Sequence, residues 1–365
     1  MNLLSYVDKY GCYSFQEVPF NEVDNAIFAS LSYLDLNGIV SPNRFSPMKI
    51  RTVGELFFQR YSKKKREILA VRNTIKLFRE MKDTRRYGDL LLYHYVYEEG
   101  EEEQFSALTI EIHSKLVYVS FEGTDHLVSG WKEDFMFSYM FPTKAQRKAI
   151  DYVNKRFLFR RKQIILGGHS KGGNLAMIAG MYANFLVRDK IIMIYNNDGP
   201  GLLKEQFESQ YYKNIEQKLI HIVPTYSVVG LILHHSKNYL SVRTNRKGLW
   251  SHDMMTWVVQ SDHFMREEIS LFSKTLEKSM LEWLDSYDKV QRERFVVSLF
   301  DIFERANIKS FVDVMENKKL ILDLITESKE LEDENRKILR DFLKMLFGCF
   351  KDVKKEEIMS IFERK

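Results

Sequence analysis

The sequence predicts an α/β protein with a mainly parallel sheet and flanking helices, plus helical N-terminal and C-terminal segments. Two observations support this fold class. Between residues 87 and 261, short runs rich in β-branched and aromatic residues alternate with helix-like segments, as in strands joined by helical crossovers. Helices are also predicted on both sides of this region, in residues 1–86 and 262–365, and the second segment is nearly free of Gly and Pro. We therefore expect an N-terminal helical segment packed on the core (1–86), an α/β core (87–261) and a helical C-terminal region (262–365).

The predicted elements follow from local patterns taken in chain order. The first region contains helix-like periodicity at residues 21–36 and again from about 53 to 82. Strands are expected at 87–98, 104–113, 115–123, 163–169, 191–196, 218–223 and 239–244. Helices are expected at 127–138, 143–157 and 171–186. The short step His113-Ser114-Lys115 between two of these strands indicates a hairpin.

Bulk composition fits a globular protein and argues against several other classes. The chain has 365 residues, 45% of them hydrophobic and 13% aromatic, which allows a sizeable core. Its net charge of +5 is small beside 55 basic and 50 acidic residues, so the whole chain is no obvious polyanion binder. Two cysteines, Cys12 and Cys349, argue against a disulfide framework and a Cys-ligated zinc site. We expect no metal and no cofactor.

The location expected from the sequence is cytoplasmic. The charged residues Asp8 and Lys9 interrupt the N-terminal stretch, and the apolar run before them is too short for a signal-peptide core. No apolar run approaches the ~18 residues of a membrane-spanning helix. The small number of cysteines agrees with a reducing compartment.

The most informative stretch is GGHSKGGNLA, residues 167–176, which has four glycines within seven positions. An apolar strand precedes it and a helix begins directly after Ser170. A serine at such a corner has a strained backbone, and glycines at 168 and 172 avoid collisions with the neighbouring strand and helix. This is the nucleophile turn of an α/β-hydrolase-like fold, so we predict Ser170 as the nucleophile, with Gly168 and Gly172 as its turn glycines. The alternative is a plain Gly-rich turn.

A nucleophilic serine also needs an oxyanion hole. The motif predicts that one donor is the backbone N–H of Lys171, which follows the serine. The second should come from Gly123-Thr124, which ends the preceding strand of the parallel core, because the carboxyl ends of neighbouring parallel strands meet at one edge. Thr124 can offer its N–H and its hydroxyl. An ordinary strand-ending turn is the alternative for this residue.

The base and the acid are expected in the chain order Ser, Asp, His. His252 lies in the loop after the last predicted strand and is the predicted base, with His263 as second choice. Asp198 ends an earlier strand, before Gly-Pro-Gly, and is the predicted acid that orients His252; Ser227 stands near the position where many hydrolases have theirs. The alternatives are an idle loop histidine and an aspartate that only caps its own turn.

These motifs resemble one known family. FEGTD, GWKEDF, GGHSKGGNLA, NNDGPG, PTYSVVG and HDMMTW together resemble the bacterial Mbeg-like family, from about residue 14 to residue 260. Its members are α/β-hydrolase-fold proteins of largely unassigned function, distantly similar to class 3 lipases. The resemblance implies this fold and a hydrolase. Where class 3 lipases have Arg and a hydrophobic residue, this sequence has Glu122 and Lys171, which speaks against a triacylglycerol substrate more than against serine chemistry.

A basic stretch from Arg60 to Arg86 contains eleven Lys or Arg and three Asp or Glu. Four apolar residues fall at helical spacing within it: Ile68, Val71, Ile75 and Phe78. One interpretation is peripheral contact with an anionic membrane surface. Another is an ordinary surface helix with solvated lysines. Nucleic acid is not expected, because no aromatic-interleaved module accompanies the charge.

Two function classes follow from the sequence. The first is a lipase-like or esterase-like serine hydrolase that cleaves a carboxylic ester or thioester through an acyl-enzyme. Its substrate would be an acyl-ester small molecule or lipid. The basic stretch 60–86 and the lipase resemblance favour an anionic head, as in a phospholipid or lysophospholipid, and Lys171 would add positive charge at the mouth of the site. The second is a catalytically weak or inactive hydrolase fold that serves as a binding or regulatory module.

Overall fold

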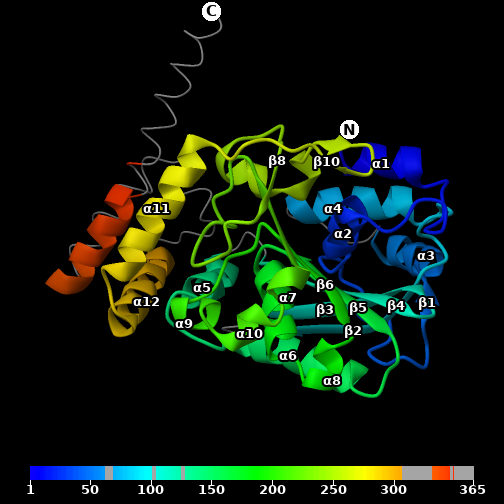
Figure 1. The fold of residues 1–365 in the computed structure, drawn as a ribbon, viewed down its shortest axis with the longest axis horizontal. Coiled ribbons are helices and arrows are strands. Elements are labelled where there is room, and N and C mark those ends of the chain that lie inside the picture. Colours follow the sequence, from blue (N-terminus) through cyan, green and yellow to red (C-terminus); the bar gives the residue numbers. More distant parts are fainter. Residues whose placement is uncertain (62–68, 101–103, 125–127, 306–330, 346–347, 349–365) are drawn as a thin grey trace, which may run out of the picture.

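The centre of the protein is an eight-stranded sheet, seen in a computed structural model that describes residues 1–61, 69–100, 104–124, 128–305, 331–345 and 348 (Figure 1). The strands are β1 (Met48–Lys49), β2 (Leu91–Glu99), β3 (Gln104–His113), β4 (Leu116–Phe121), β5 (Gln163–His169), β6 (Ile191–Asn197), β7 (Leu219–Pro224) and β8 (Leu240–Val242). They lie in chain order across the sheet. Strands β1 to β4 pair antiparallel, and β4 to β8 pair parallel. The predicted mainly parallel α/β fold is confirmed.

The predicted strands all overlap observed ones, and the hairpin at residues 113–115 joins β3 to β4 as expected. Strand β1 was not predicted. It has two residues and pairs Met48 with Leu92 and Lys49 with Leu91, so the first region is not wholly helical. A strand this short has no period of its own, and only its partner reveals it.

Helices cover both faces of the sheet (Figure 1). One face carries α1 (Leu3–Tyr10), α2 (Glu22–Leu31), α3 (Ile50–Tyr61) and α4 (Leu69–Met81). The other face carries α6 (Lys144–Phe157), α7 (Lys171–Tyr182) and α8 (Phe185–Arg188). Alternate residues of β4 serve the two layers, since Tyr118 packs with the first set and Val117 and Val119 with the second. Burial on both faces explains why these strands read as continuous apolar runs.

The single helix predicted from about 53 to 82 is wrong in its extent. The structure has α3 ending at Tyr61 and α4 beginning at Leu69, and residues 62–68 lie outside the described part of the chain. Within α4, Ile75 and Phe78 are buried against the core, as the helical spacing predicted. Ile68 belongs to the residues that are not described.

The C-terminal helices form a separate apolar layer. Helices α11 (Leu271–Asp285) and α12 (Lys289–Arg305), with helical residues 333–345, pack on α5 (Val128–Met136) in a hydrophobic cluster distinct from those on the sheet faces. They stand on the opposite side of the molecule from α3 and β1 (Figure 1). A small hairpin, β9 (Val259–Gln260) and β10 (His263–Phe264), precedes them. Within the described part of the chain, no helix is long and apolar enough to cross a membrane.

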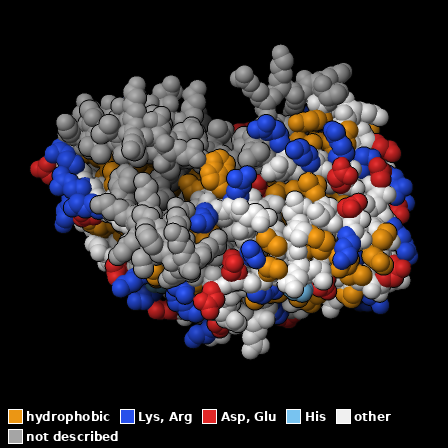
Figure 2. All heavy atoms as spheres, turned by 90° about the horizontal axis from the view of Figure 1, so that it is seen from above, with side chains coloured by type: hydrophobic (Ala, Val, Ile, Leu, Met, Phe, Trp, Pro, Cys, Tyr) orange, Lys and Arg blue, Asp and Glu red, His pale blue; other side chains and the backbone are white. Residues whose placement is uncertain are grey.

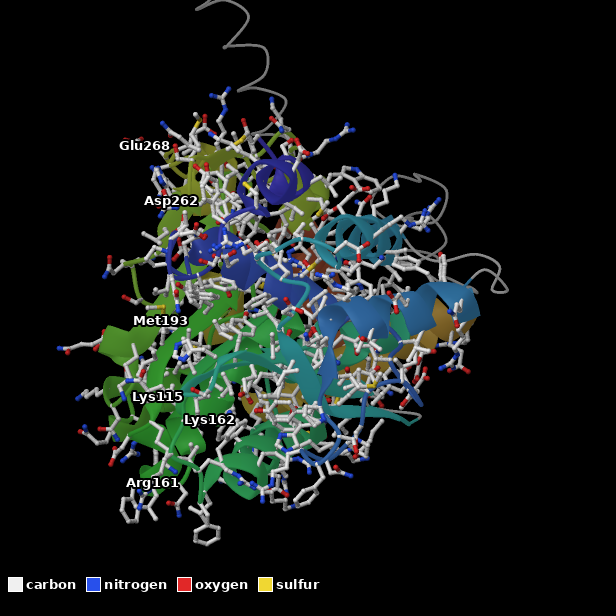
Figure 3. All side chains as sticks on the ribbon, turned by 90° about the vertical axis from the view of Figure 1, so that its right-hand side faces the viewer. Lys115, Arg161, Lys162, Met193, Asp262 and Glu268 are labelled. Atoms are coloured by element: carbon white, nitrogen blue, oxygen red, sulfur yellow. The ribbon has the colours of Figure 1, made fainter. Side chains whose placement is uncertain are left out.

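The two ends of the parallel strands differ in character. Lys115 and Lys162 directly precede β4 and β5 and lie near one another at one edge of the sheet (Figure 3). The carboxyl ends of the same strands lead into Gly123 and Ser170, at the opposite edge. Ligand sites of α/β proteins form outside the carboxyl ends of parallel strands, so this second edge is where a site is expected.

Candidate active site

Ser170 occupies a strained corner between β5 and α7. Its backbone has φ +58° and ψ −132°, a left-handed conformation that costs a non-glycine residue free energy. The residues around it must be glycines, because a larger side chain would collide with neighbouring backbone atoms. A Cβ on Gly168 would lie 2.3 Å from the Gly172 carbonyl, and a Cβ on Gly172 would lie 2.1 Å from the oxygen of Phe121. The serine therefore sits where strand, helix and neighbouring strand make their closest approach.

Asp198 and His252 form a short hydrogen-bonded pair. Nδ1 of His252 lies 2.6 Å from Oδ2 of Asp198. The carboxylate is fully buried, and the imidazole side chain is 13% exposed. Asp198 directly follows β6, and His252 ends a 3₁₀ turn (Gly248–His252) after β8, so residues from distant parts of the chain meet here. With Nδ1–H donated to the carboxylate, the imidazole keeps a lone pair on Nε2.

Ser227 supports the same carboxylate. Its hydroxyl donates a 2.6 Å hydrogen bond to Oδ1 of Asp198, and the Gly230 N–H donates to that oxygen at 3.0 Å. Many hydrolases have their acid near the position of Ser227. Here Ser227 instead donates a hydrogen bond to the predicted acid, Asp198, which follows the neighbouring strand. Burial raises the pKa of Asp198 to about 7, although the Ser227 hydrogen bond lowers it.

The backbone places Ser170 beside this pair. The N–H of Ser170 donates to the Asn197 carbonyl at 3.0 Å, in continuation of the β5–β6 register, and Asp198 is the next residue. A Cβ on Gly199 would lie 2.2 Å from the Ser170 carbonyl oxygen. The ring of His252 packs against the ring of His169, with centroids 4.4 Å apart. The structure therefore brings the predicted nucleophile, acid and base to one edge of the sheet.

His169 and Tyr33 are site residues that the sequence reasoning missed. Nε2 of His169 lies 2.7 Å from the His252 carbonyl oxygen, and Nδ1 lies 2.9 Å from the Tyr33 hydroxyl. His169 therefore ties the 3₁₀ turn that carries His252 to the strand that carries Ser170. The position next to the serine was a signal for His169, but nothing in the sequence pairs it with Tyr33, which lies just beyond α2.

The predicted oxyanion donors flank the serine. Gly123 lies against the turn, since a Cβ on it would approach the Ser170 Cβ to 3.1 Å and the His169 carbonyl oxygen to 2.4 Å. Thr124 follows immediately. On the other side, Lys171 is the first residue of α7, and the first N–H groups of a helix have no intrahelical acceptor. The structure thus places Gly123 against one side of the serine and Lys171 at the start of the helix that follows it.

The Lys171 side chain is not at the mouth of the site. It is 1% exposed, and its Nζ contacts Oε2 of Glu133 at 3.0 Å and the Gln104 carbonyl oxygen at 2.9 Å. The expectation that it presents positive charge to a substrate is wrong, because helix α5 supplies a buried carboxylate that neutralises it. A buried ion pair of this kind fixes α5 over the start of α7.

His263 and His221 do not take the place of His252 in the pair with Asp198. His263, the second choice as base, belongs to β10, and its Nδ1 contacts the carboxylate of Asp262. Asp262 lies at the periphery of the molecule (Figure 3). His221 is inside β7, and burial lowers its pKa to about 3. Among the residues that the structure describes, no group of three or more His, Cys, Asp or Glu could hold a metal ion.

Two basic residues in the described part of the stretch 60–86 are paired with carboxylates. Arg86 is fully buried and pairs with the buried Asp24, at 2.5 Å. Arg85 pairs with Glu17 on the surface. On the face seen in Figure 2, Lys and Arg side chains of the described residues are interspersed with Asp and Glu. The count of eleven basic residues therefore overstates the charge that this stretch presents.

The fold and the glycine-framed serine at the carboxyl ends of parallel strands define an α/β-hydrolase-like protein. The Mbeg1-like family model matches residues 81–301, which is more than half of the chain, and the protein belongs to this family. The resemblance found in the sequence is confirmed. No curated protein matches the chain. Among solved structures, a crystal structure of M37 lipase is similar, with 14% identity, a TM-score of 0.36, and coverage of 56% of this chain and 68% of that chain.

Proposed function

We propose that this protein is a serine hydrolase that cleaves a carboxylic ester or thioester through an acyl-enzyme. Ser170 is the nucleophile, His252 the general base and Asp198 the residue that orients and stabilises His252. The observation that carries the proposal is the buried 2.6 Å pair of Asp198 and His252 beside a serine with φ +58°. A structural serine or an idle histidine requires neither feature.

The chemistry follows from the positions of these groups. Ser170 Oγ attacks the acyl carbonyl carbon while Nε2 of His252 takes the hydroxyl proton, and the carbonyl π electrons move to oxygen. The N–H groups of Lys171 and Thr124 stabilise that oxyanion. The tetrahedral intermediate collapses, the leaving alcohol or thiol departs with the proton from His252, and the acyl group stays on Ser170. Water then attacks the acyl-enzyme by the same steps and releases the carboxylic acid.

Hydrolysis of p-nitrophenyl esters by wild type and Ser170→Ala tests the proposal. We expect Ser170→Ala to fold normally and to lose at least ~10³-fold in kcat, since removal of a triad member leaves only the residual catalysis of the oxyanion hole. Ser209→Ala is a matched control, because Ser209 caps α10 (Gln210–Lys213) away from the site. Equal rates for Ser170→Ala and wild type overturn the assignment. No turnover by the wild type against any ester favours a binding or regulatory module instead.

We also propose peripheral contact with an anionic surface, through fewer basic side chains than the sequence indicated. The described basic side chains of residues 69–86 include Arg85 and Arg86, which pair with carboxylates, so fewer charges can face a membrane. Each Lys or Arg near an anionic surface contributes about 1 kcal/mol, screened by salt. Co-sedimentation with anionic vesicles at low salt and its loss at high salt would support contact. Equal recovery with neutral and anionic vesicles would exclude it.

A further inference from the structure

An apolar cavity lies between the candidate active site and the C-terminal helices. Its wall comes from α5, from the segments after β6 and β7, from α11 and from the helical residues 333–345. The apolar side chains that line it include Trp131, Phe135, Ile232, Met280, Trp283 and Phe342. Most of these belong to the hydrophobic cluster that joins the C-terminal helices to α5. Apolar cavities with few polar groups are typical of sites for small organic ligands.

The cavity reaches the reacting groups through three of its lining residues. Pro200 is two residues from Asp198, and Val229 precedes Gly230, whose N–H binds the Asp198 carboxylate. Asp134 comes from α5; burial raises the pKa of its carboxyl group, although Lys171 and a hydrogen bond with Thr124 lower it. The wall of the cavity therefore includes residues that lie near the predicted acid in the chain and one that contacts a predicted oxyanion donor.

Two polar atoms in the wall of this cavity have no hydrogen-bond partner among the residues that the structure describes. They are Trp283 Nε1 and Asp134 Oδ1, and both are buried. A buried donor or acceptor without a partner is unfavourable, because it has lost its hydrogen bonds to water. These two atoms in the wall of one apolar cavity indicate that it accepts a molecule with a few polar atoms.

A second cavity includes the histidine of the pair and has a different lining. It is bounded by His169, His252, Tyr33 and Trp250 among others. His252 must return its proton to the leaving group, so the leaving group has to lie on the histidine side of the serine. The acyl chain is a separate substituent of the carbonyl carbon and needs a space away from the leaving group, and the apolar cavity, which His252 does not line, offers one.

We propose that the cavity between α5 and α11 binds the apolar acyl chain of the substrate, so that the enzyme acts on esters of medium or long acyl chains. This inference rests on the proposed serine hydrolysis. It also gives the C-terminal helices a function, because α11 and the segment around Phe342 supply one wall of the acyl site.

Chain-length profiles with p-nitrophenyl acetate, butyrate, octanoate and decanoate test the cavity. Burial of one methylene corresponds to about fourfold in kcat/KM, so octanoate should exceed acetate by at least tenfold. Met280→Trp fills the cavity from α11 and should lower kcat/KM for decanoate at least tenfold while the value for acetate stays within about twofold. Lys278→Trp is the matched control, since the Lys278 side chain is 78% exposed on the same helix. A flat profile, or equal effects of the two variants, overturns the proposal.

A binding measurement keeps the test independent of turnover and of the folding of Met280→Trp. Decanoate, the product of such an ester, is titrated into Ser170→Ala while tryptophan fluorescence is recorded. The signal should disappear when Trp131→Phe and Trp283→Phe are combined and persist with Trp250→Phe, because Trp131 and Trp283 line the proposed cavity and Trp250 lines the other one. The reverse pattern, or no binding, overturns the acyl site. Decanoate binding at Trp283 without any ester turnover would support the cavity and contradict the serine hydrolase.

Discussion

Replacement of Asp198 by Asn removes the negative charge of the pair while it keeps the shape of the side chain. The Asn oxygen can still accept the hydrogen bonds of Ser227 and Gly230, which both reach Oδ1 of Asp198. The amide nitrogen then faces Nδ1 of His252, in place of the carboxylate oxygen that lies 2.6 Å away. An N–H cannot accept from another N–H, so the imidazole must carry its proton on Nε2, where it can no longer take the serine proton.

The magnitude of the loss follows from that change of tautomer. We expect kcat to fall by about 10³–10⁴, which corresponds to about 4–5.5 kcal/mol of transition-state stabilisation. The fold should persist, because Asn needs no ionised group in this fully buried position. At pH 8 the melting temperature of Asp198→Asn should therefore equal or exceed that of the wild type.

Steady-state hydrolysis of the best p-nitrophenyl ester at pH 8, with thermal unfolding of the same samples, measures both effects. Asp189→Asn is the control, since Asp189 lies at the end of α8 outside the site and should leave kcat unchanged. If Asp198→Asn keeps more than a tenth of the wild-type kcat, Asp198 does not orient the base. Loss of activity together with loss of the folded state would point to a structural carboxylate.

Three further outcomes are expected. Gly172→Ala should destabilise the fold by about 1–3 kcal/mol, because its Cβ would lie 2.1 Å from the Phe121 oxygen. Gly348→Ala should not destabilise it, since no described atom lies within 4 Å of the added Cβ. Equal melting temperatures for the two variants would contradict this. The kcat/KM of the wild type should rise with pH through about 7 and then level, because burial raises the pKa of Asp198 to about 7 and a protonated pair provides no base; a midpoint below pH 5 would contradict it. Burial also raises the pKa of Asp134 to about 7, so the contribution of this carboxyl group to stability is present at low pH and is lost as pH rises. The unfolding free energy of Asp134→Asn minus that of the wild type should therefore increase by about 2–3 kcal/mol between pH 5 and pH 8. Chemical denaturation at the two pH values measures this difference, and an unchanged difference would contradict the prediction.

Local patterns were sufficient for the sheet and for the serine turn. The strands are apolar on both faces and are bounded by turns, so they can be recognised without knowledge of their partners. A side chain at Gly168 would collide with the backbone of Gly172, and one at Gly172 would collide with the backbone of Phe121. The spacing of the glycines in the sequence indicates this steric requirement. Asp198 and His252 could be predicted as a pair because chain order and strand ends limit the candidates, and the two side chains are hydrogen-bonded.

Long-range contacts explain what the sequence did not reveal. His169 binds Tyr33 and the His252 carbonyl, contacts that depend on how α2 and the turn after β8 meet. The Lys171 charge was expected at the mouth of the site because its partner, Glu133, is 38 residues earlier in the chain and only the packing of α5 brings them together. The cavity beside α11 has the same origin, since no local pattern shows that the C-terminal helices pack on α5.

The central claim is that Ser170 is an activated nucleophile. A fluorophosphonate reacts only with a serine whose proton is taken by a base, so its site of attachment reports activation directly. We expect one adduct per chain by intact mass, mapped by proteolysis to the peptide that contains residues 167–176, with none in Ser170→Ala and strongly slowed labelling in Asp198→Asn. Attachment at a different residue, or a folded wild type that does not react at all, would contradict the account.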